Sequence, residues 1–348
     1  MTPPAALVLE DGAVFRGESV GAPVTALGEA VFTTGMTGYQ EVATDPSFYG
    51  QIVCFTAPMV GNYGVAAHRS ESAVPHVRGI VMREARGPAW TDWLTAHGIP
   101  ALTGIDTRAL TLHLRANGAL RAAIVPGEAD VDGAAELARS EPSMSGRPLA
   151  DRVSTSGPYT FSTEGAARVA VVDFGAKRSI LRQLAANGAA VMVFPYDVDA
   201  DTLAAFDGVV LSNGPGDPEP LVSETATVRE LLGRVPVLGI CLGHQLLALA
   251  TGLATFKLPF GHRGANHPVV EVATRRVLVT SQNHGFAVAP APGEGATHES
   301  LYDGTVEGLA YPDLRACSVQ FHPEAGPGPH DARPIIRNWV EELSRAAA

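Results

Sequence analysis

The stretch 239-GICLGHQ-245 lies within a long apolar segment, 235-VPVLGICLGHQLLALATG-252. The first part of this segment, 235-VPVLGI-240, is typical of a buried β-strand, and the part that begins at Leu242 is typical of a buried helix. Cys241 stands at the junction, with a glycine two residues away on each side. The segment therefore raises the question of whether Cys241 is a packing residue or a reactive one.

Strands and helices alternate around this junction in the C-terminal half of the chain. The other expected strands are 168-RVAVVDF-174, 190-AVMVFP-195 and 208-GVVLS-212, and the expected helices are 177–187, 199–205, 223–233 and 242–251. This alternation predicts an α/β domain whose mostly parallel sheet carries helices on both faces. Ligands bind beyond the carboxyl ends of the strands in such sheets, and Cys241 falls at one of these ends. The chain then becomes β-rich up to the strand 316-ACSVQF-321 and closes with a helix over 332–346.

The first third of the chain has a different pattern, in which short strands are joined by glycine turns. A β-hairpin is expected around Asp11-Gly12, further strands at 29-EAVFTT-34, 51-QIVCFTAP-58 and 121-RAAIV-125, and helices at 89–98 and 106–118. Asp106 and Gly118 stand where an N-cap and a C-terminal glycine belong. We therefore expect an α+β domain over 1–150, a Ser-, Thr- and Gly-rich linker over 151–167, and the α/β domain over 168–348.

Length and composition limit the classes of partner and compartment. The 348 residues suit two domains, and they carry a net charge of −11 without any basic run, so nucleic acid is not expected as a partner. The N-terminus lacks the positive region of a signal peptide, and polar residues and glycines interrupt the apolar segment, so no membrane association is expected. Three widely spaced cysteines suit a reducing compartment. These features predict a cytoplasmic protein.

The sequence Gly-Ile-Cys-Leu-Gly is the thiol counterpart of the G-x-S-x-G nucleophile elbow. In an elbow, a sharp strand-to-helix turn holds the nucleophile in a strained conformation, and the glycines leave room for the turn. A thiol reacts as its thiolate, which a helix N-terminus and a nearby imidazolium favour, and the N–H of Leu242 would face an oxyanion. The alternative is that Cys241 packs as a small hydrophobe. For Cys54 and Cys317, which lie in apolar strands, that alternative is the prediction.

A nucleophilic thiol needs a base, and the base needs a group that orients it. The stretch 320-QFHPEAGPGPHD-331 offers His322 and Glu324 directly after an expected strand. Pro323 excludes a helix interior, and residues two apart point the same way in an extended chain, so Glu324 can lie beside His322. A histidine at a strand end is also commonly a surface residue, so this pair alone leaves both interpretations open. With Cys241 it forms a Cys–His–Glu set.

Two further features of the C-terminal half bear on ligand binding. The loop 212-SNGPGDPEP-220 follows a parallel strand and is rigid enough to present backbone N–H groups to a substrate, although it could equally be a plain turn. It lacks the Lys-Ser/Thr of a phosphate-binding loop and the spacing of a dinucleotide fingerprint. No metal site is expected, because no metal-ligand spacing relates the histidines of the β-rich part, which are His262, His267, His284 and His298.

The motifs GICLGHQ, SNGPGDP and HPE together resemble those of class I (triad) glutamine amidotransferases, a family with a flavodoxin-like α/β domain. Further stretches resemble, more narrowly, the small subunit of carbamoyl-phosphate synthetase, and the resemblance runs almost from end to end. Gly35, Ala265 and Gly326 depart from the usual pattern of that family, which puts only local loop geometry in doubt. The further stretches are 6-ALVLEDG-12, 35-GMTGYQEVATDPSFYGQIV-53, 104-GIDTRALT-111, 173-DFGAKRSILRQL-184, 280-TSQNHGFAV-288 and 324-EAGPGPHD-331.

The resemblance implies that the chain is a glutaminase subunit. It implies that Cys241 attacks the amide carbon of L-glutamine to form a glutamyl thioester, that His322 transfers the protons, and that Glu324 orients His322. Ammonia would pass to a large subunit, the partner in a heterodimer, which makes carbamoyl phosphate from it with bicarbonate, ATP and Mg for pyrimidine and arginine biosynthesis. This chain would hold no cofactor itself. The implied glutamine-binding residues are Ser47, Gly214, Gly216, Leu242, Gln245, Asn283, Gly285 and Phe286.

Two other functions are compatible with parts of the pattern. A stand-alone thiol hydrolase would share the elbow, but the usual order in α/β-hydrolases places the acid between the nucleophile and the histidine, whereas Glu324 follows His322. A regulator or scaffold with an inactive amidotransferase fold typically lacks the nucleophile or the histidine, and this chain has both. The glutaminase subunit is therefore the leading hypothesis.

Overall fold

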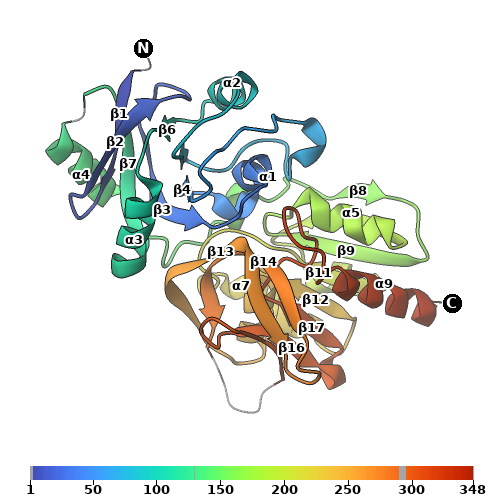
Figure 1. Ribbon diagram of the computed structural model, residues 1–348. Coiled ribbons are helices and arrows are strands. Elements are labelled where there is room, and N and C mark those ends of the chain that lie inside the picture. Colours follow the sequence, from blue (N-terminus) through green and yellow to red (C-terminus); the bar gives the residue numbers. More distant parts are fainter. Residues whose placement is uncertain (1–2, 129, 290–294, 348) are drawn as a thin grey trace. The chain divides into compact units, whose positions relative to one another are not determined.

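The computed structural model describes residues 3–128, 130–289 and 295–347, and the chain divides into two compact units (Figure 1). The first unit comprises Met1–Met144 and Pro259–Arg263, and the second comprises Ser145–Leu258 and Gly264–Ala348. Each unit has buried hydrophobic cores of its own. Within the described ranges, none of the helices combines the length and the hydrophobicity that crossing a bilayer requires.

The first unit is built around a closed β-barrel with the strand order β1-β2-β6-β5-β4-β3-β7. The hairpin predicted at Asp11-Gly12 is confirmed, since β1 and β2 pair antiparallel and Gly12 takes a φ of 89° in the turn. Side chains such as Leu7, Ile52 and Leu102 form the core of the barrel. The strands are β1 (Pro4–Leu9), β2 (Val14–Ser19), β3 (Ala26–Thr33), β4 (Gln51–Phe55), β5 (Gly79–Val81), β6 (Ala101–Thr103) and β7 (Leu120–Pro126).

Helices pack around the barrel, and the best predicted of them is α3 (Thr107–Asn117). Asp106 caps this helix as expected, because its Oδ1 accepts the N–H of Ala109 at 2.9 Å. Gly118 ends it with a φ of 90°. The apolar face of α3 packs on the barrel core through Leu110 and Leu114. The other helices of the unit are α1 (Tyr39–Thr44), α2 (Pro88–Ala96) and α4 (Val131–Ser140).

The cap of α3 leads to a stability prediction for the first unit. We expect Asp106→Ala to lower the free energy of unfolding of this unit by about 1 kcal/mol, because the first turn loses the acceptor for an otherwise unpaired N–H group. Urea denaturation followed by circular dichroism measures this change. Asp92→Ala is the control, since Asp92 is an exposed residue within α2 and makes no cap. An equal loss in both variants would contradict the assigned cap.

The second unit is an α/β structure built on a mixed sheet with the order β14-β13-β15-β16-β17-β12-β11-β9-β10-β8. Its centre, β10-β9-β11-β12-β17, is parallel throughout, as the alternation of strands and helices predicts. The strands are β8 (Tyr159–Ser162), β9 (Ala167–Asp173), β10 (Ala189–Pro195), β11 (Gly208–Leu211), β12 (Val237–Ile240), β13 (Thr255–Glu271), β14 (Val277–Val288), β15 (Ala296–Ser300), β16 (Val306–Tyr311) and β17 (Ala316–Val319).

Strand β8 lies within 151–167, the segment whose composition predicts a linker. It pairs antiparallel with β10, with Thr160 opposite Met192 and Tyr159 opposite Val193. Its side chains are mostly exposed. An edge strand held by backbone hydrogen bonds therefore follows the first unit, in a place where composition alone indicates irregular chain.

Helices cover both faces of the parallel strands, as predicted. Alternate residues of β11 show the division: Val209 and Leu211 belong to one core and Val210 to the other. The first core includes side chains of α6 (Ala200–Leu203), α7 (Val222–Leu231) and α8 (Leu242–Ala250). The second includes side chains of α5 (Arg178–Ala186) and α9 (Pro334–Ala347), which lie together in Figure 1.

The parallel strands bring distant parts of the sequence to one edge of the sheet. Pairing in register places Leu211 beside Val172 and Gly239, and Ile240 beside Val319. The residues that follow these strands therefore gather at the shared carboxyl edge, where ligands bind in open α/β sheets.

Candidate active site

Cys241 lies between the end of β12 and the first residue of α8. Its backbone has a φ of 54° and a ψ of −103°, which is a strained conformation for a residue with a side chain and typically costs about 1 to 3 kcal/mol. The Cys241 N–H donates to Val319 O at 2.9 Å and so holds the residue against the neighbouring strand. The strained elbow predicted from the sequence is confirmed, and the thiol stands at the positive end of a helix.

The two flanking glycines make this turn possible through close packing. A Cβ on Gly239 would lie 2.5 Å from Gly243 O, and a Cβ on Gly243 would lie 2.2 Å from Leu211 O. Both of these atoms belong to the backbone, so a side chain at either glycine would displace a strand or the start of α8. The glycines are therefore needed for the approach of α8 to the sheet.

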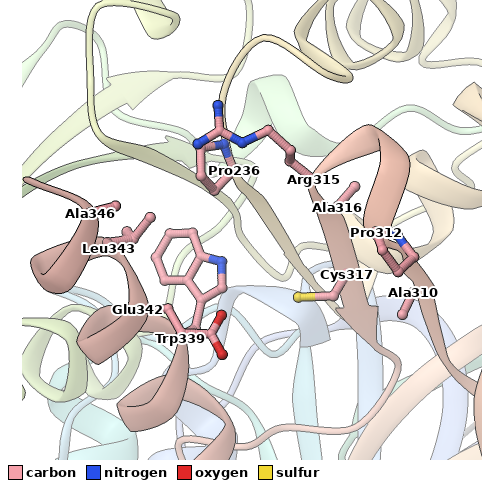
Figure 2. Close-up of a pocket in the computed structure, with 10 residues that line it drawn as sticks. All are labelled: Pro236, Ala310, Pro312, Arg315, Ala316, Cys317, Trp339, Glu342, Leu343 and Ala346. Carbon is pink, nitrogen blue, oxygen red and sulfur yellow. The ribbon is translucent and has the colours of Figure 1, made fainter.

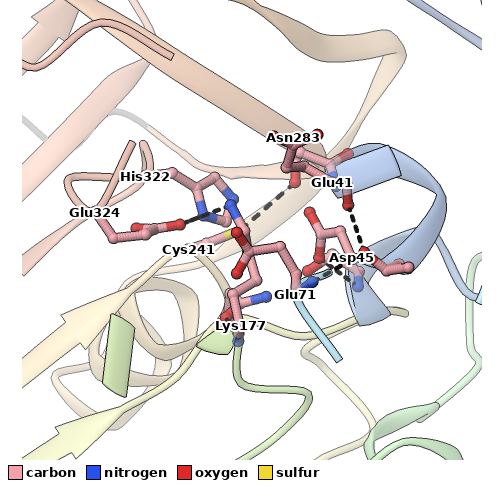
Figure 3. A network of polar contacts seen from close by, with 11 residues as sticks. Glu41, Asp45, Glu71, Lys177, Cys241, Asn283, His322 and Glu324 are labelled. Atoms are coloured by element: carbon pink, nitrogen blue, oxygen red, sulfur yellow. Dashed lines mark hydrogen bonds and ion pairs between the residues drawn. The ribbon is translucent and has the colours of Figure 1, made fainter. Parts of the chain in front are cut away.

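His322 and Glu324 follow β17 and form a buried hydrogen-bonded pair (Figure 3). His322 Nδ1 lies 2.7 Å from Glu324 Oε1. The backbone N–H of His322 donates to Ser281 O at 2.9 Å, which ties this turn to β14. Because Nδ1 is engaged with Glu324, Nε2 is the nitrogen that can exchange a proton with the thiol of Cys241.

Burial and charge act in opposite directions on this pair. Burial lowers the pKa of His322, but the charge of the Glu324 carboxylate and the polar contacts of the ring together outweigh it, so the pKa of His322 lies above its ordinary value. Burial likewise raises the pKa of Glu324, and the charges of Lys177 and His322 outweigh it, so the pKa of Glu324 lies below its ordinary value. The site therefore favours an imidazolium beside a carboxylate.

Lys177 shares the carboxylate of Glu324, although sequence reasoning does not single it out. Its Nζ lies 2.8 Å from Glu324 Oε1, and its side chain is 2% exposed. Its backbone N–H donates to Asn213 Oδ1 at 3.1 Å, which joins the turn after β9 to the loop after β11. The sequence feature that could have indicated Lys177 as a site residue is its position just beyond the carboxyl end of an expected strand, 168–174.

The charge of Lys177 leads to a prediction about pH dependence. This charge lowers the pKa of His322, so we expect Lys177→Met to raise that pKa and to shift the corresponding limb of the kcat/KM profile for glutamine hydrolysis to higher pH. We also expect kcat to fall about tenfold, because the carboxylate that orients His322 loses a support. Initial rates measured across the pH range test both effects.

Arg178→Met is the control for this prediction, because it removes a positive charge one residue away that does not pair with Glu324 in the described part of the chain. An unchanged profile in Lys177→Met, or an equal shift in both variants, would show that the ion pair does not tune His322.

The loop 212–220 lies beside the elbow. The Gly243 N–H donates to Ser212 O at 3.0 Å. Gly214 approaches the start of α8, because a Cβ on it would lie 2.8 Å from Leu242 Cδ2. Gly216, with a φ of 93°, instead faces the chain at 147–149. The structure thus brings Gly214 to Leu242, while Gly216 lies where the loop packs on the start of the second unit.

Strand β14 contains three of the implied glutamine-binding residues, Asn283, Gly285 and Phe286, and lies beside Cys241. The thiol of Cys241 donates to Asn283 O at 3.6 Å. Gln245 Nε2 donates to Phe286 O at 2.9 Å and to Gln320 Oε1 at 3.1 Å. Gly285 lies between the two contact points on the same strand. The side-chain amide of Gln245 therefore joins α8 to β14.

Ser47, the remaining implied glutamine ligand, belongs to the first unit. It lies in a 3-10 helix, Pro46–Phe48, and its N–H donates to Asp45 Oδ1 at 2.9 Å. Its side chain is buried. The part of Ser47 in binding glutamine stays a prediction.

The other two cysteines have the environment of packing residues. Cys54 is buried in the barrel, where burial raises its pKa to about 12. Cys317 lies in β17 on a cavity of about 390 Å³, in which its sulfur is directed toward Trp339 (Figure 2). Burial, and then the charge of Glu342, raise its pKa to about 11. Both residues are therefore neutral thiols near pH 7, a form that is a poor nucleophile.

Known families and proteins resemble this chain over almost its whole length. A model described as glutamine amidotransferase class-I matches residues 170–342, and one described as carbamoyl-phosphate synthase small chain, CPSase domain, matches residues 7–124. A carbamoyl phosphate synthase small chain of Symbiobacterium thermophilum is 48% identical, over 97% of this chain and 98% of the relative. A protein of the same description from Thermosynechococcus vestitus is 48% identical, over 99% of this chain and 97% of the relative. Another, from Methanopyrus kandleri, is 48% identical, over 97% of this chain and 98% of the relative.

Proposed function

We propose a glutaminase function for this chain, which belongs to the family of carbamoyl phosphate synthase small chains. It hydrolyses L-glutamine to glutamate and ammonia in the cytoplasm, and the ammonia passes to a large chain that makes carbamoyl phosphate from it with bicarbonate, ATP and Mg. The observation that carries this proposal is the thiol of Cys241, held at a strained elbow next to a buried His322–Glu324 pair.

The geometry supports a two-step reaction. The Cys241 thiolate attacks the side-chain amide carbon of glutamine, and the negative charge moves to the amide oxygen, which the N–H of Leu242 is suited to stabilise. The tetrahedral intermediate collapses as the His322 imidazolium gives its Nε2 proton to the leaving nitrogen, which departs as ammonia. Neutral His322 then takes a proton from water, whose oxygen attacks the thioester carbon. Glutamate leaves, and the sulfur again faces an imidazolium.

Glu324 and Lys177 support this cycle without contacting the reacting atoms. Glu324 holds Nδ1 of His322, which keeps Nε2 directed at the thiol and stabilises the imidazolium. Lys177 holds Glu324. We propose that glutamine lies between the loop at Gly214 and strand β14 and is bound by the residues that the resemblance implies, which are Ser47, Gly214, Gly216, Leu242, Gln245, Asn283, Gly285 and Phe286.

Co-purification with the large chain tests this function. We expect glutamine hydrolysis by the complex to accelerate when ATP and bicarbonate are present, and the released nitrogen to appear in carbamoyl phosphate. A rate of glutamine hydrolysis that the large chain does not change would contradict the proposal. Thiol-dependent ester hydrolysis that is faster than glutamine hydrolysis would also contradict it and would favour a stand-alone hydrolase. No reaction with a glutamine analogue that alkylates active-site thiols would favour an inactive fold.

A further inference from the structure

A second group of side chains lies in the first unit, around the exposed face of α3, and Arg83 joins it from the segment after β5. Three arginines, Arg83, Arg108 and Arg115, line one cavity of about 420 Å³ together with Leu112. All four side chains are exposed. The stretch 104-GIDTRALT-111, which contributes Arg108, resembles the family pattern, yet glutamine hydrolysis gives it no role.

The arginines have no carboxylate partner within the described ranges of the chain. Among the described residues, none of the three guanidinium groups forms a salt bridge with a carboxylate, whereas exposed Arg86 does so with Glu84 and Arg121 with Glu10. Like charges that share a cavity repel one another, and the chain as a whole carries a net charge of −11. A cluster of unpaired arginines in an acidic protein therefore indicates that the counter-charge comes from another molecule.

The position of Arg108 supports this interpretation. It is the second residue of α3, where the positive end of the helix disfavours a cation by about 0.3 to 1 kcal/mol. The N–H of Ala109 at this helix end already donates to Asp106. A side chain of the protein itself thus already occupies part of the helix end at which a phosphate usually binds, and the three arginine side chains supply the positive charge of the cavity.

Leu112 distinguishes a protein partner from a small anion. It lies four residues after Arg108 and three before Arg115, so the three side chains share one face of α3. Its side chain is 52% exposed, and the guanidinium of Arg115 lies 5.9 Å from the ring centre of Phe260. An exposed leucine with arginines around it matches the apolar centre and arginine-rich composition of protein interfaces, whereas a free anion would leave the leucine without a contact.

We propose that Arg83, Arg108, Leu112 and Arg115, named here the α3 face, dock an acidic segment of the large chain. The segment presents carboxylates to the guanidinium groups and an apolar side chain to Leu112. This inference rests on the proposed function, because it takes the large chain as the partner. It adds the place at which the two chains meet and the chemistry of the partner's surface.

Binding of the full-length chain to the purified large chain tests the α3 face. The test variant carries Arg83→Glu, Arg108→Glu and Arg115→Glu. The control carries Arg16→Glu, Arg275→Glu and Arg276→Glu, which reverse three exposed arginines that also lack a carboxylate partner among the described residues. Both variants change the formal charge equally. Glutamine hydrolysis by each small chain alone shows that it is folded.

We expect the test variant to weaken the complex about a hundredfold and the control to weaken it less than about threefold, with the effect of the test variant decreasing at high salt. Leu112→Ala, which removes an exposed side chain without a charge change, should weaken the complex about tenfold, and it provides the measurement if the triple variant does not fold. Equal affinities of the wild type, the test variant and Leu112→Ala would overturn the inference and leave the proposed function intact.

Two other outcomes would also overturn the inference. If the wild-type chain does not bind the large chain, the proposed function fails together with the α3 face. If inorganic phosphate raises the melting temperature of the small chain alone, and only the test variant loses this effect while its binding to the large chain is unchanged, the cavity is a small-anion site.

Discussion

Replacing Cys241 with serine is expected to reduce glutamine-dependent synthesis of carbamoyl phosphate by the complex at least about a thousandfold. A hydroxyl group is far less acidic than a thiol, so the imidazolium of His322 cannot hold it as an anion, and the acyl intermediate does not form. Ammonia supplied directly does not need this thiol. We therefore expect ammonia-dependent synthesis by the same complex to stay within about twofold of the wild type.

The comparison of the two nitrogen sources is the measurement, and Cys317→Ser is its control. Cys317 is also a cysteine of the second unit, but burial keeps it as a neutral thiol, so its replacement should leave both rates unchanged. A Cys241→Ser complex that uses glutamine at the wild-type rate would show that another group is the nucleophile. Loss of both activities together would instead indicate that the substitution disturbs the assembly.

The centre of the fold was predictable because it follows from local patterns. The central parallel strands β11 and β12 are buried on both faces, so their sequences are continuous apolar runs. The elbow was predictable because the spacing of Gly239, Cys241 and Gly243 is itself the geometric requirement. His322 and Glu324 could be paired from their spacing, with one residue between them, but the segment is a turn closed by the N–H of Ala325 on His322 O, and the expected extended conformation was wrong.

Features that depend on pairing between distant segments were not predictable. The first domain was expected to be α+β. The closure of its barrel depends on the pairing of β1 with β7, which lies more than a hundred residues later in the chain. The hydrophobic pattern within either strand does not indicate this pairing. Strand β8 was missed because its side chains are exposed and backbone hydrogen bonds hold it. Lys177 was missed because its partner, Glu324, lies 147 residues away, and a single lysine in a turn usually faces solvent.

Glu324→Gln is expected to destabilise the second unit by about 3 kcal/mol and to slow glutamine hydrolysis about a hundredfold or more. The substitution keeps the shape of the side chain but removes the carboxylate that both Lys177 and His322 contact in the buried site. Removing one partner of a buried ion pair costs about 3 to 5 kcal/mol. The imidazolium also loses the charge that orients and stabilises it.

Glu341→Gln is a matched control for this prediction, because it makes the same substitution in the same unit. Glu341 lies in α9 near Arg337 and Arg345, with about half of its side chain exposed. Exposed pairs of this kind typically contribute at most about 1 kcal/mol. The free energy of unfolding and kcat/KM for glutamine should therefore change little in Glu341→Gln. Equal losses in both variants would show that the buried group of Lys177, His322 and Glu324 does not stabilise the fold.

The dependence on pH separates the charge of Glu324 from its shape. The pKa of Glu324 is lowered from its ordinary value of 4.5, so the stability it contributes is present above that pH and is lost as the pH falls. The pKa of His322 is raised from its ordinary value of 6.5, so its contribution is complete below that pH and is lost as the pH rises toward the folded-state value. The difference in unfolding free energy between the wild type and Glu324→Gln should therefore be largest between pH 4.5 and 6.5 and should decrease on both sides. A difference that is constant with pH would mean that Glu324 acts through packing. It would contradict the proposal that the charges of Lys177, His322 and Glu324 stabilise the fold.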